Sequence, residues 1–143
     1  MELDAQLCFD LYAASRVVTG AYRPLLDELG LTYPQYLVML VLWERGRATV
    51  SELGDALQLD SGTLSPLLKR LNAAGLVARE RRTDDERSVE AVLTDEGRAM
   101  RAKAERVPPA IGAAMGLKPA EFTALKRMLR QLAHNVSTSE LIR

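Results

Sequence analysis

The only cysteine of this 143-residue chain, Cys8, is followed by all four of its tyrosines: Tyr12, Tyr22, Tyr33 and Tyr36. One thiol cannot form a disulfide within its own chain, so Cys8 is either a small apolar residue packed in the core or a reactive group. Phenol hydroxyls are among the few side-chain donors that can hold a thiolate, or its oxidised forms, in mostly apolar surroundings. The first question is therefore whether the tyrosines reach the cysteine.

Helix geometry decides which tyrosine can do so. Apolar residues recur at three- and four-residue spacing through the N-terminal segment, which predicts a long amphipathic helix. Tyr12 lies one turn after Cys8 on the same face, whereas Tyr22 lies about 21 Å further along the axis of a straight helix. Tyr22, joined by Tyr33 from the start of the next helix, could approach Cys8 only from a second subunit whose helix pairs antiparallel with the first.

A thiolate at Cys8 would carry redox chemistry. Hydrogen-bond donors and a nearby helix N-terminus favour the thiolate, which is the form that attacks a peroxide oxygen. The product would be a sulfenic acid. Because the chain has no second cysteine, that acid would react with a small thiol, cyclise to a sulfenamide or be overoxidised. The alternative is that Cys8 is simply a small buried hydrophobe.

Composition places the chain among ordinary globular proteins. Apolar residues make up 48% and charged residues 27% of the sequence, and this length fits one domain. The longest strongly apolar run, Tyr36 to Trp43, is far too short to span a membrane. Glu2 and Asp4 stand where a secretory signal would carry basic residues. We therefore expect a cytoplasmic protein that makes no membrane contact.

The net charge is zero but unevenly distributed: residues 1–60 carry −5, residues 61–82 carry +4 and the remainder +1. A local basic segment suits a polyanion bound by one surface, although a solvated charged face would look the same.

Start and stop signals divide the chain into helices. Gly20 and Pro24 are expected to kink or interrupt the first helix, with Gly30 as its stop. Thr32 and Gln35 form a capping-box pattern for a second helix ending near Gly46, and Trp43 within it is expected in the core. Further helices are predicted from Thr94 to about Val107, broken by Pro108–Pro109, and from Lys118–Pro119 onward.

Two short helices, VSELGDALQL and a segment from about Thr63 to Ala74, are joined by a turn at Asp60–Gly62. Pro66 suggests that the second of them starts late or bends. Two strand-like runs follow, LVARERR and SVEAVL, which predict a hairpin. The fold class is therefore mainly α with a small β-hairpin wing, a winged helix-turn-helix flanked by terminal helices.

The second helix of such a motif carries short polar groups near its start and cations further along, which read bases and neutralise phosphates. Candidate DNA-binding residues are Ser61, Thr63, Ser65, Lys69 and Arg70, with Arg87 at the hairpin tip oriented by Asp85. Each has a plainer interpretation: Ser61 only caps the helix, Lys69 is solvated, and Asp85–Arg87 is a surface ion pair. Their order and spacing together favour DNA binding.

The run LDSGTLSPLLKRLNAAGLVARERRTDDERSVEAVLTDEG resembles the core of the MarR family of winged-helix repressors, and LCFDLYAASR…YRPLLDELGLTYPQYLVMLVLWE resembles its organic hydroperoxide resistance regulators. The resemblance implies one domain over 1–143: a winged helix-turn-helix at 31–94, and dimerisation helices at 1–30 and 95–143. It further implies a homodimer on an inverted-repeat operator, with Cys8 as the redox sensor. Thiolate-supporting tyrosines would be Tyr22 and Tyr33 from the partner, with Tyr12 nearby.

Three functions remain to be separated. The first is a transcriptional repressor that organic hydroperoxides release from DNA through Cys8, with a low-molecular-weight thiol completing the reaction. The second is a repressor released by a small aromatic ligand. The third, a thiol peroxidase, is disfavoured because the chain has no resolving cysteine and its only histidine, His134, lies near the C-terminal end. No metal-ligand cluster, glycine-rich phosphate loop or hydrolase triad stands in the sequence, so we expect no enzyme and no cofactor.

Overall fold

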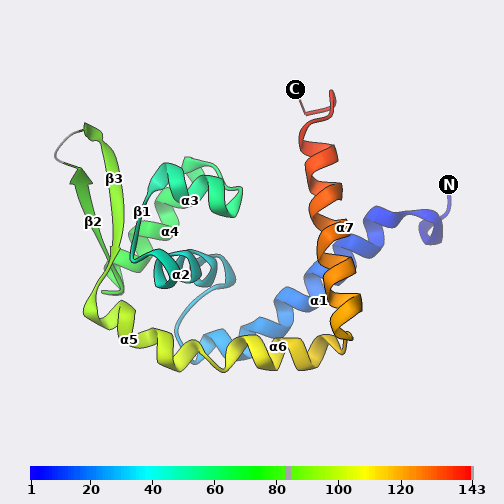
Figure 1. The fold of residues 1–143 in the computed structure, drawn as a ribbon, viewed down its shortest axis with the longest axis horizontal. Coiled ribbons are helices and arrows are strands. Elements are labelled where there is room, and N and C mark those ends of the chain that lie inside the picture. The colour runs from blue at the N-terminus through cyan, green and yellow to red at the C-terminus, as the bar shows by residue number, and fades with distance from the viewer. Residues whose placement is uncertain (83–84, 143) are drawn as a thin grey trace. The chain divides into compact units, whose positions relative to one another are not determined.

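A computed structural model of the chain describes residues 1–82 and 85–142, without the side chains of residues 82–88. The chain forms two compact units, residues 1–108 and 109–143 (Figure 1). A short 3-10 turn, Leu3–Ala5, precedes helix α1, Leu7–Asp27. The four helices and three strands that follow within the first unit build its core.

Helix α1 is continuous, so the expected interruption at Gly20 and Pro24 is wrong. A proline inside a helix clashes with the carbonyl four residues earlier, and here that residue is Gly20, whose backbone adjusts most easily. The same spacing places Gly62 four residues before Pro66 in helix α4, Ser61–Ala73, which starts ahead of its proline instead of late. The stop at Gly30 is confirmed, with φ of +69°.

Helix α2, Tyr33–Arg45, is the centre of the first unit. Its capping box is formed as expected, with the Thr32 hydroxyl accepting from the Gln35 backbone and the Gln35 side chain accepting from the Thr32 backbone. Its other end turns at Gly46, with φ of +82°. Val38, Met39 and Leu42 along it are completely buried.

The sheet has one strand more than the sequence predicts. Strand β1, Arg47–Thr49, precedes helix α3, Val50–Leu57, and it pairs antiparallel with strand β3, Asp85–Leu93. Strand β2, Val77–Arg82, lies on the other side of β3, so the order is β1-β3-β2. The predicted hairpin is confirmed as β2 and β3, and the missed strand covers its second edge.

The helix expected to run to about Val107 ends three residues earlier, and the prolines expected to break it lie in the first turn of the next helix. Helix α5, Asp95–Ala104, is capped by Thr94, and helix α6 begins at Val107 and runs to Met115. The two prolines therefore open a helix, at positions where a missing N–H costs little. Helix α7, Pro119–Ser137, starts where the sequence predicts.

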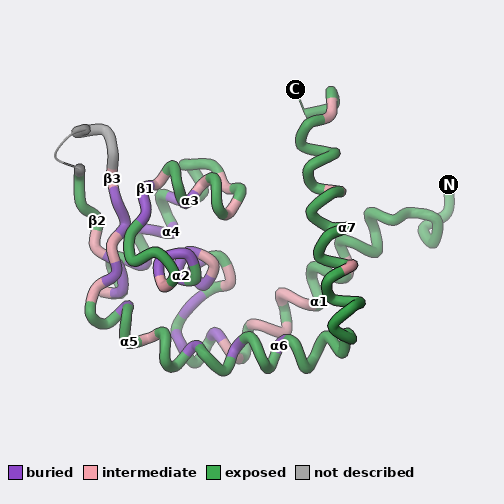
Figure 2. Tube along the Cα trace, in the orientation of Figure 1, coloured by how far each residue is buried: buried purple, intermediate pink, exposed green. Residues whose placement is uncertain are grey.

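Buried residues gather in α2, α4 and the sheet, whereas α1 and α7 are largely exposed along their lengths (Figure 2). Several large apolar side chains of these two helices face solvent: Leu7, Phe9, Leu11, Val17, Phe122, Leu125, Met128 and Leu129. Among the described residues no helix is long and apolar enough to cross a membrane.

Candidate functional site

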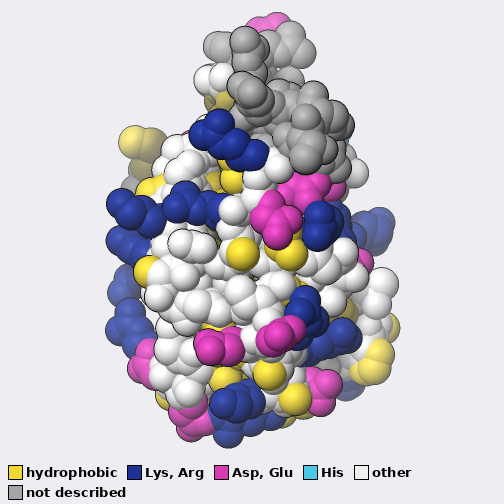
Figure 3. All heavy atoms as spheres, turned by 90° about the vertical axis from the view of Figure 1, so that its left-hand side faces the viewer, with side chains coloured by type: hydrophobic (Ala, Val, Ile, Leu, Met, Phe, Trp, Pro, Cys, Tyr) yellow, Lys and Arg dark blue, Asp and Glu magenta, His cyan; other side chains and the backbone are white. Residues whose placement is uncertain are grey.

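Helix α4 separates its residues cleanly between core and surface. Leu64, Leu67, Leu68 and Leu71 are buried, and the opposite face carries every residue predicted there for DNA: Ser61, Thr63, Ser65, Lys69 and Arg70, all exposed. The four leucines fix the helix against the core, so the polar face has a defined orientation. Basic side chains are spread along one edge of the face seen in Figure 3, with acidic side chains among them.

Asp60, not Ser61, caps helix α4. The backbone N–H of Thr63 donates to Asp60 Oδ1 at 2.7 Å, and Ser61 is the first residue of the helix proper. The interpretation of Ser61 as a cap alone is therefore wrong, and its hydroxyl remains available at the exposed helix start. The hydrogen bonds from Thr63 lower the pKa of the Asp60 carboxyl, and the bond from Gly62 adds to them.

Replacing Asp60 tests this cap. Asp60→Ala should lower the thermal midpoint, whereas Asp60→Asn should lower it less, because an amide oxygen still accepts from the Thr63 N–H but carries no charge at the helix N-terminus. Since the folded-state pKa is depressed, the carboxylate stabilises the fold above its unfolded-state pKa, and this contribution is lost as the pH falls through the folded value. The difference between wild type and Asp60→Ala in thermal melts should therefore shrink below about pH 4. A difference independent of pH would contradict the assignment.

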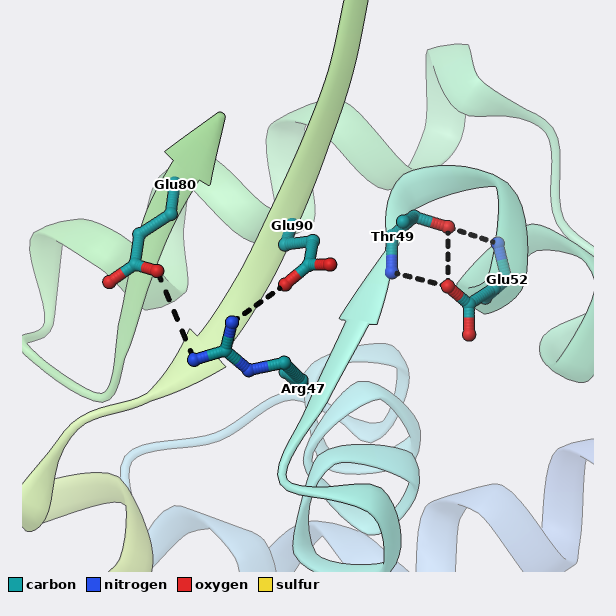
Figure 4. Close-up of polar contacts among 5 residues, drawn as sticks. All are labelled: Arg47, Thr49, Glu52, Glu80 and Glu90. Atoms are coloured by element: carbon teal, nitrogen blue, oxygen red, sulfur yellow. Dashed lines mark hydrogen bonds and ion pairs between the residues drawn. The ribbon is translucent and has the colours of Figure 1, made fainter. Parts of the chain in front are cut away.

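Arg47 braces the wing at its base. Arg47 of β1 donates from Nη1 to Glu90 Oε2 on β3 at 3.1 Å, and its Nη2 lies 4.0 Å from Glu80 Oε2 on β2 (Figure 4). Glu80 and Glu90 face one another directly in the β2–β3 register, a placement of like charges that weakens a strand pair. Arg47 relieves that repulsion and joins all three strands.

The expected tip residues of the wing, Asp85 and Arg87, belong to β3 by their backbone. Their side chains lie outside the described residues, so their roles stay predictions. The brace at Arg47 and Glu90 was missed by sequence reasoning, since its partners are 43 residues apart in the chain.

The tyrosines gather at the junction of α1 and α2. The ring centroids of Tyr22 and Tyr33 are 4.7 Å apart, and those of Tyr22 and Tyr36 are 5.8 Å apart. Burial raises the pKa of all three, and mutual proximity raises it further for Tyr22 and Tyr36. These phenols therefore remain neutral hydrogen-bond donors across the physiological pH range. Tyr36 is an addition to the set that the sequence singled out.

Cys8 lies apart from this cluster. It is the second residue of α1 and is exposed, so the interpretation as a buried hydrophobe is wrong for the isolated chain. Because α1 runs unbroken from Leu7 to Asp27, Tyr22 of the same chain is about 21 Å further along the helix. Tyr12, one turn from Cys8, is 61% exposed. The Arg16 guanidinium carbon lies over the Tyr12 ring, 5.5 Å from the ring centroid.

A pocket of about 460 Å³ opens beside the tyrosine cluster. Tyr22 and Tyr33 line it together with Arg16, Arg23 and the hydroxyl-bearing Thr19 and Thr32, and the lining also includes the buried Leu26 and Leu31. It therefore combines phenol donors, two cations and apolar side chains, and it can take a small polar group attached to an apolar one.

Trp43, expected in the core, is half-buried. Its ring meets Tyr36 edge-on, with centroids 6.3 Å apart, and its Nε1 donates to the Gly97 carbonyl of α5 at 2.8 Å.

An exposed polar face on the second helix of a helix-turn-helix, followed by a three-stranded antiparallel wing, defines a winged helix-turn-helix protein. Residues 21–103 match the family model described as transcriptional regulator SarA/Rot. The chain belongs to this group of SarA/Rot/MarR-type winged-helix transcriptional regulators, which confirms the resemblance found in the sequence.

Two curated relatives place the chain more closely. It is 48% identical over 128 residues to the organic hydroperoxide resistance transcriptional regulator of Bacillus subtilis, covering 90% of this chain and 85% of that one. It is 52% identical to the HTH-type transcriptional regulator TtmR of Methylorubrum extorquens, over 86% of this chain and 63% of that longer one.

Solved structures of AbfR of Staphylococcus epidermidis match as well. Reduced AbfR bound to DNA superposes with a TM-score of 0.79, and overoxidised AbfR bound to DNA with 0.78. Both are 39% identical, and the matches cover 94% of each chain.

Proposed function

We propose that this protein is a DNA-binding transcriptional repressor that senses organic hydroperoxides by oxidation of Cys8 and then releases its operator. One observation carries the redox half of the proposal: α1 bears an exposed thiol at one end and an open, tyrosine-lined pocket at the other. The two cannot meet within one chain, and an antiparallel pairing of two α1 helices would bring them together. The name of the B. subtilis relative supports the class of inducer.

The functional unit is a homodimer, with residues 1–30 and 95–143 as dimerisation helices. Support comes from exposed apolar side chains on both segments, such as Leu7 at 67% and Met128 at 63% exposure. A face of this kind seldom stays open to solvent. Charge favours the association of these two segments in the dimer, because the N-terminal segment is acidic where α7 is basic. The acids are Glu2, Asp4 and Asp10, and the bases are Lys126, Arg127 and Arg130.

On DNA each protomer sets α4 into a major groove of one half-site of an inverted repeat, with half-site centres about 10 bp apart. Ser61, Thr63 and Ser65 contact base edges or phosphates near the helix start, while Lys69 and Arg70 neutralise phosphates. Arg87, held by Asp85, enters the adjacent minor groove. This site lies in the cytoplasm, where a lone thiol stays reduced until a peroxide reaches it.

The chemistry at Cys8 balances in two steps. The thiolate attacks the terminal oxygen of the hydroperoxide and the O–O bond breaks, which leaves a sulfenic acid and an alkoxide. The alkoxide takes up a proton, equivalent to the one lost by the thiol, and departs as the alcohol. A low-molecular-weight thiol then condenses with the sulfenic acid to a mixed disulfide and water. The reaction is stoichiometric signalling, without a cofactor. The added group displaces Tyr22 and Tyr33 and shifts the dimer helices, and a thousandfold loss of operator affinity corresponds to about 4 kcal/mol.

A gel shift on the promoter of a neighbouring gene tests this function, with and without organic hydroperoxide, with and without a small thiol, and with intact mass on every sample. We expect release only when the mass of the protein changes. AbfR is bound to DNA in its overoxidised form, so samples carrying only the sulfinic or sulfonic acid are scored separately from the mixed disulfide. Full binding by the mixed-disulfide protein would refute the proposal.

A second candidate is a repressor released by a small aromatic ligand. The tyrosine-lined pocket favours it, because its lining combines two cations, Arg16 and Arg23, with apolar and aromatic side chains, which suits an aromatic carboxylate. Such a ligand alone would release DNA with the mass of the protein unchanged, which separates it from the redox function in the same assay.

The brace at the wing gives a further prediction. Arg47→Ala should lower operator affinity several-fold because the wing loses its orientation, while the slope of log affinity against log salt stays unchanged. Lys69→Ala is the matched control: as the loss of one phosphate contact in each protomer of the dimer, it should reduce that slope by about 1.8. Fluorescence anisotropy across a salt series measures both quantities. An equal fall in slope for Arg47→Ala would mean that Arg47 contacts DNA itself.

A further inference from the structure

We propose that Trp43 is a positioning residue that transmits a displacement of the tyrosine cluster to the recognition helix α4. This inference rests on the proposed function, and it names the part of the fold that connects oxidation to DNA release. Every residue that it uses lies in the first compact unit of the chain.

The connection starts at Tyr36. This side chain is 2% exposed, and its ring centroid lies 5.8 Å from that of Tyr22 and 6.4 Å from that of Tyr33. Tyr22 and Tyr33 line the open pocket, whereas the buried Tyr36 lies outside its lining, so a group that fills the pocket pushes the two rings toward Tyr36. Any group that displaces Tyr22 and Tyr33 therefore also displaces the Tyr36 ring.

Trp43 contacts Tyr36 from a position two turns further along α2. Tyr36 and Trp43 are seven residues apart and so share one face of the helix, where their rings meet edge-to-face at an interplanar angle of 69°. The opposite end of the indole is anchored, since Nε1 donates to the Gly97 carbonyl at 2.8 Å. The indole of Trp43 is therefore held at both ends, by the Tyr36 ring on one side and by the hydrogen bond to Gly97 on the other, so its position is defined.

Gly97 passes the contact to the end of α4. A Cβ built at Gly97 would lie 2.1 Å from the Leu76 carbonyl oxygen, so the two backbones touch. Thr94 ties the same junction twice: its N–H donates to the Leu76 carbonyl at 3.1 Å, and its hydroxyl to the Gly75 carbonyl at 2.6 Å. Leu76 in turn donates to the carbonyl of Leu71 in α4 at 3.0 Å.

The contacts therefore form one continuous path from the redox tyrosines through Tyr36, Trp43 and Gly97 to the recognition helix. Physical contiguity alone does not establish energetic coupling. The alternative is that the indole bond merely satisfies a half-buried N–H, in which case its removal would cost stability and leave the redox response intact.

Trp43→Phe separates the two, because it keeps an aromatic ring against Tyr36 and removes the donor to Gly97. Operator affinity is measured for reduced protein and for protein carrying a mixed disulfide at Cys8. We expect the reduced variant to bind within about threefold of wild type, and its oxidised-to-reduced affinity ratio to shrink by about tenfold. Intact mass should show Cys8 oxidised at the wild-type rate. A wild-type ratio would overturn the inference.

Val41→Ala is the control for stability. Val41 is 8% exposed on the same helix and takes no part in the path, so this variant loses packing and should keep the full redox response. Tyr36→Leu provides a second variant should Trp43→Phe fail to fold, since it keeps apolar volume but removes the ring edge. It should shrink the ratio as Trp43→Phe does, and an unchanged ratio would equally overturn the inference.

Wild-type protein offers a direct readout, because Trp43 is the only tryptophan of the chain. Oxidation of Cys8 should shift its emission without DNA present, and unchanged emission on full mixed-disulfide formation would contradict the inference. Wild-type protein that keeps its operator affinity when oxidised would instead refute the proposed function. If oxidation releases the wild-type protein from DNA, and releases the Trp43→Phe and Tyr36→Leu variants equally, only the role of Trp43 is refuted.

Discussion

A Cys8→Ser protein should bind its operator as tightly as wild type and remain bound at hydroperoxide doses that release wild type completely. The substitution exchanges sulfur for oxygen at an exposed position in the first turn of α1, so neither packing nor the α4 surface changes. A serine hydroxyl is not a nucleophile toward peroxides, and the oxidation that drives release cannot begin. Gel shifts over a hydroperoxide series, with intact mass, measure the outcome.

Moving the thiol makes the matched control. Cys8→Ser combined with Val17→Cys has one thiol on the same helix, nine residues further along and on the opposite face, and Val17 is 74% exposed. That thiol lies away from the position at which the partner's tyrosines would meet Cys8, so its oxidation should leave DNA binding intact. Release of Cys8→Ser at wild-type doses would remove Cys8 from the sensing mechanism.

Gly97→Ala should strongly destabilise the protein, because an added Cβ would make its closest contact there among the nine glycines of the chain. Its Cβ would lie 2.1 Å from the Leu76 carbonyl oxygen and 3.1 Å from Leu93 Cδ2, so the backbone of α5 must move away from the end of α4. Overpacking of this kind costs about 1–3 kcal/mol or more, and here it also disturbs the bond from Trp43. Urea titrations measure the free energy of unfolding, and gel shifts should show weakened operator binding.

Gly112→Ala is the counterpart. Gly112 lies inside α6, and a Cβ added there would have no contact within 4 Å beyond the helix's own backbone and chain neighbours. Alanine is favoured over glycine in a helix interior by about 1 kcal/mol, so this variant should be neutral or more stable. Equal stability of the Gly97→Ala and wild-type proteins would mean that the contact between α5 and the end of α4 is looser than described.

Sequence reasoning succeeds here wherever a signal is local. The capping box predicted at Thr32 joins residues only three positions apart, and it is formed. Prolines mislead it, because Pro24 and Pro66 each follow a glycine by four residues and are tolerated inside helices. Strand β1 is missed since three residues give no usable period, and its partner strand lies far along the chain.

The candidate site divides in the same way. The exposed face of α4 follows from helical periodicity, and the separation of Cys8 from Tyr22 follows from the rise of a helix. Contacts between distant segments do not: Arg47 with Glu90, and Trp43 with Gly97, join residues 43 and 54 positions apart. No local pattern marks them, and only the packed fold brings them together.

The strand order β1-β3-β2 also sets a sequence of events during synthesis. As the chain leaves the ribosome, α2 and β1 emerge first, but β1 pairs only with β3. The β2–β3 hairpin closes a short loop, whereas joining β1 closes one of more than forty residues, which is entropically slower. Until then Arg47 lacks Glu90, and we expect β1 to join the sheet after the β2–β3 hairpin has formed.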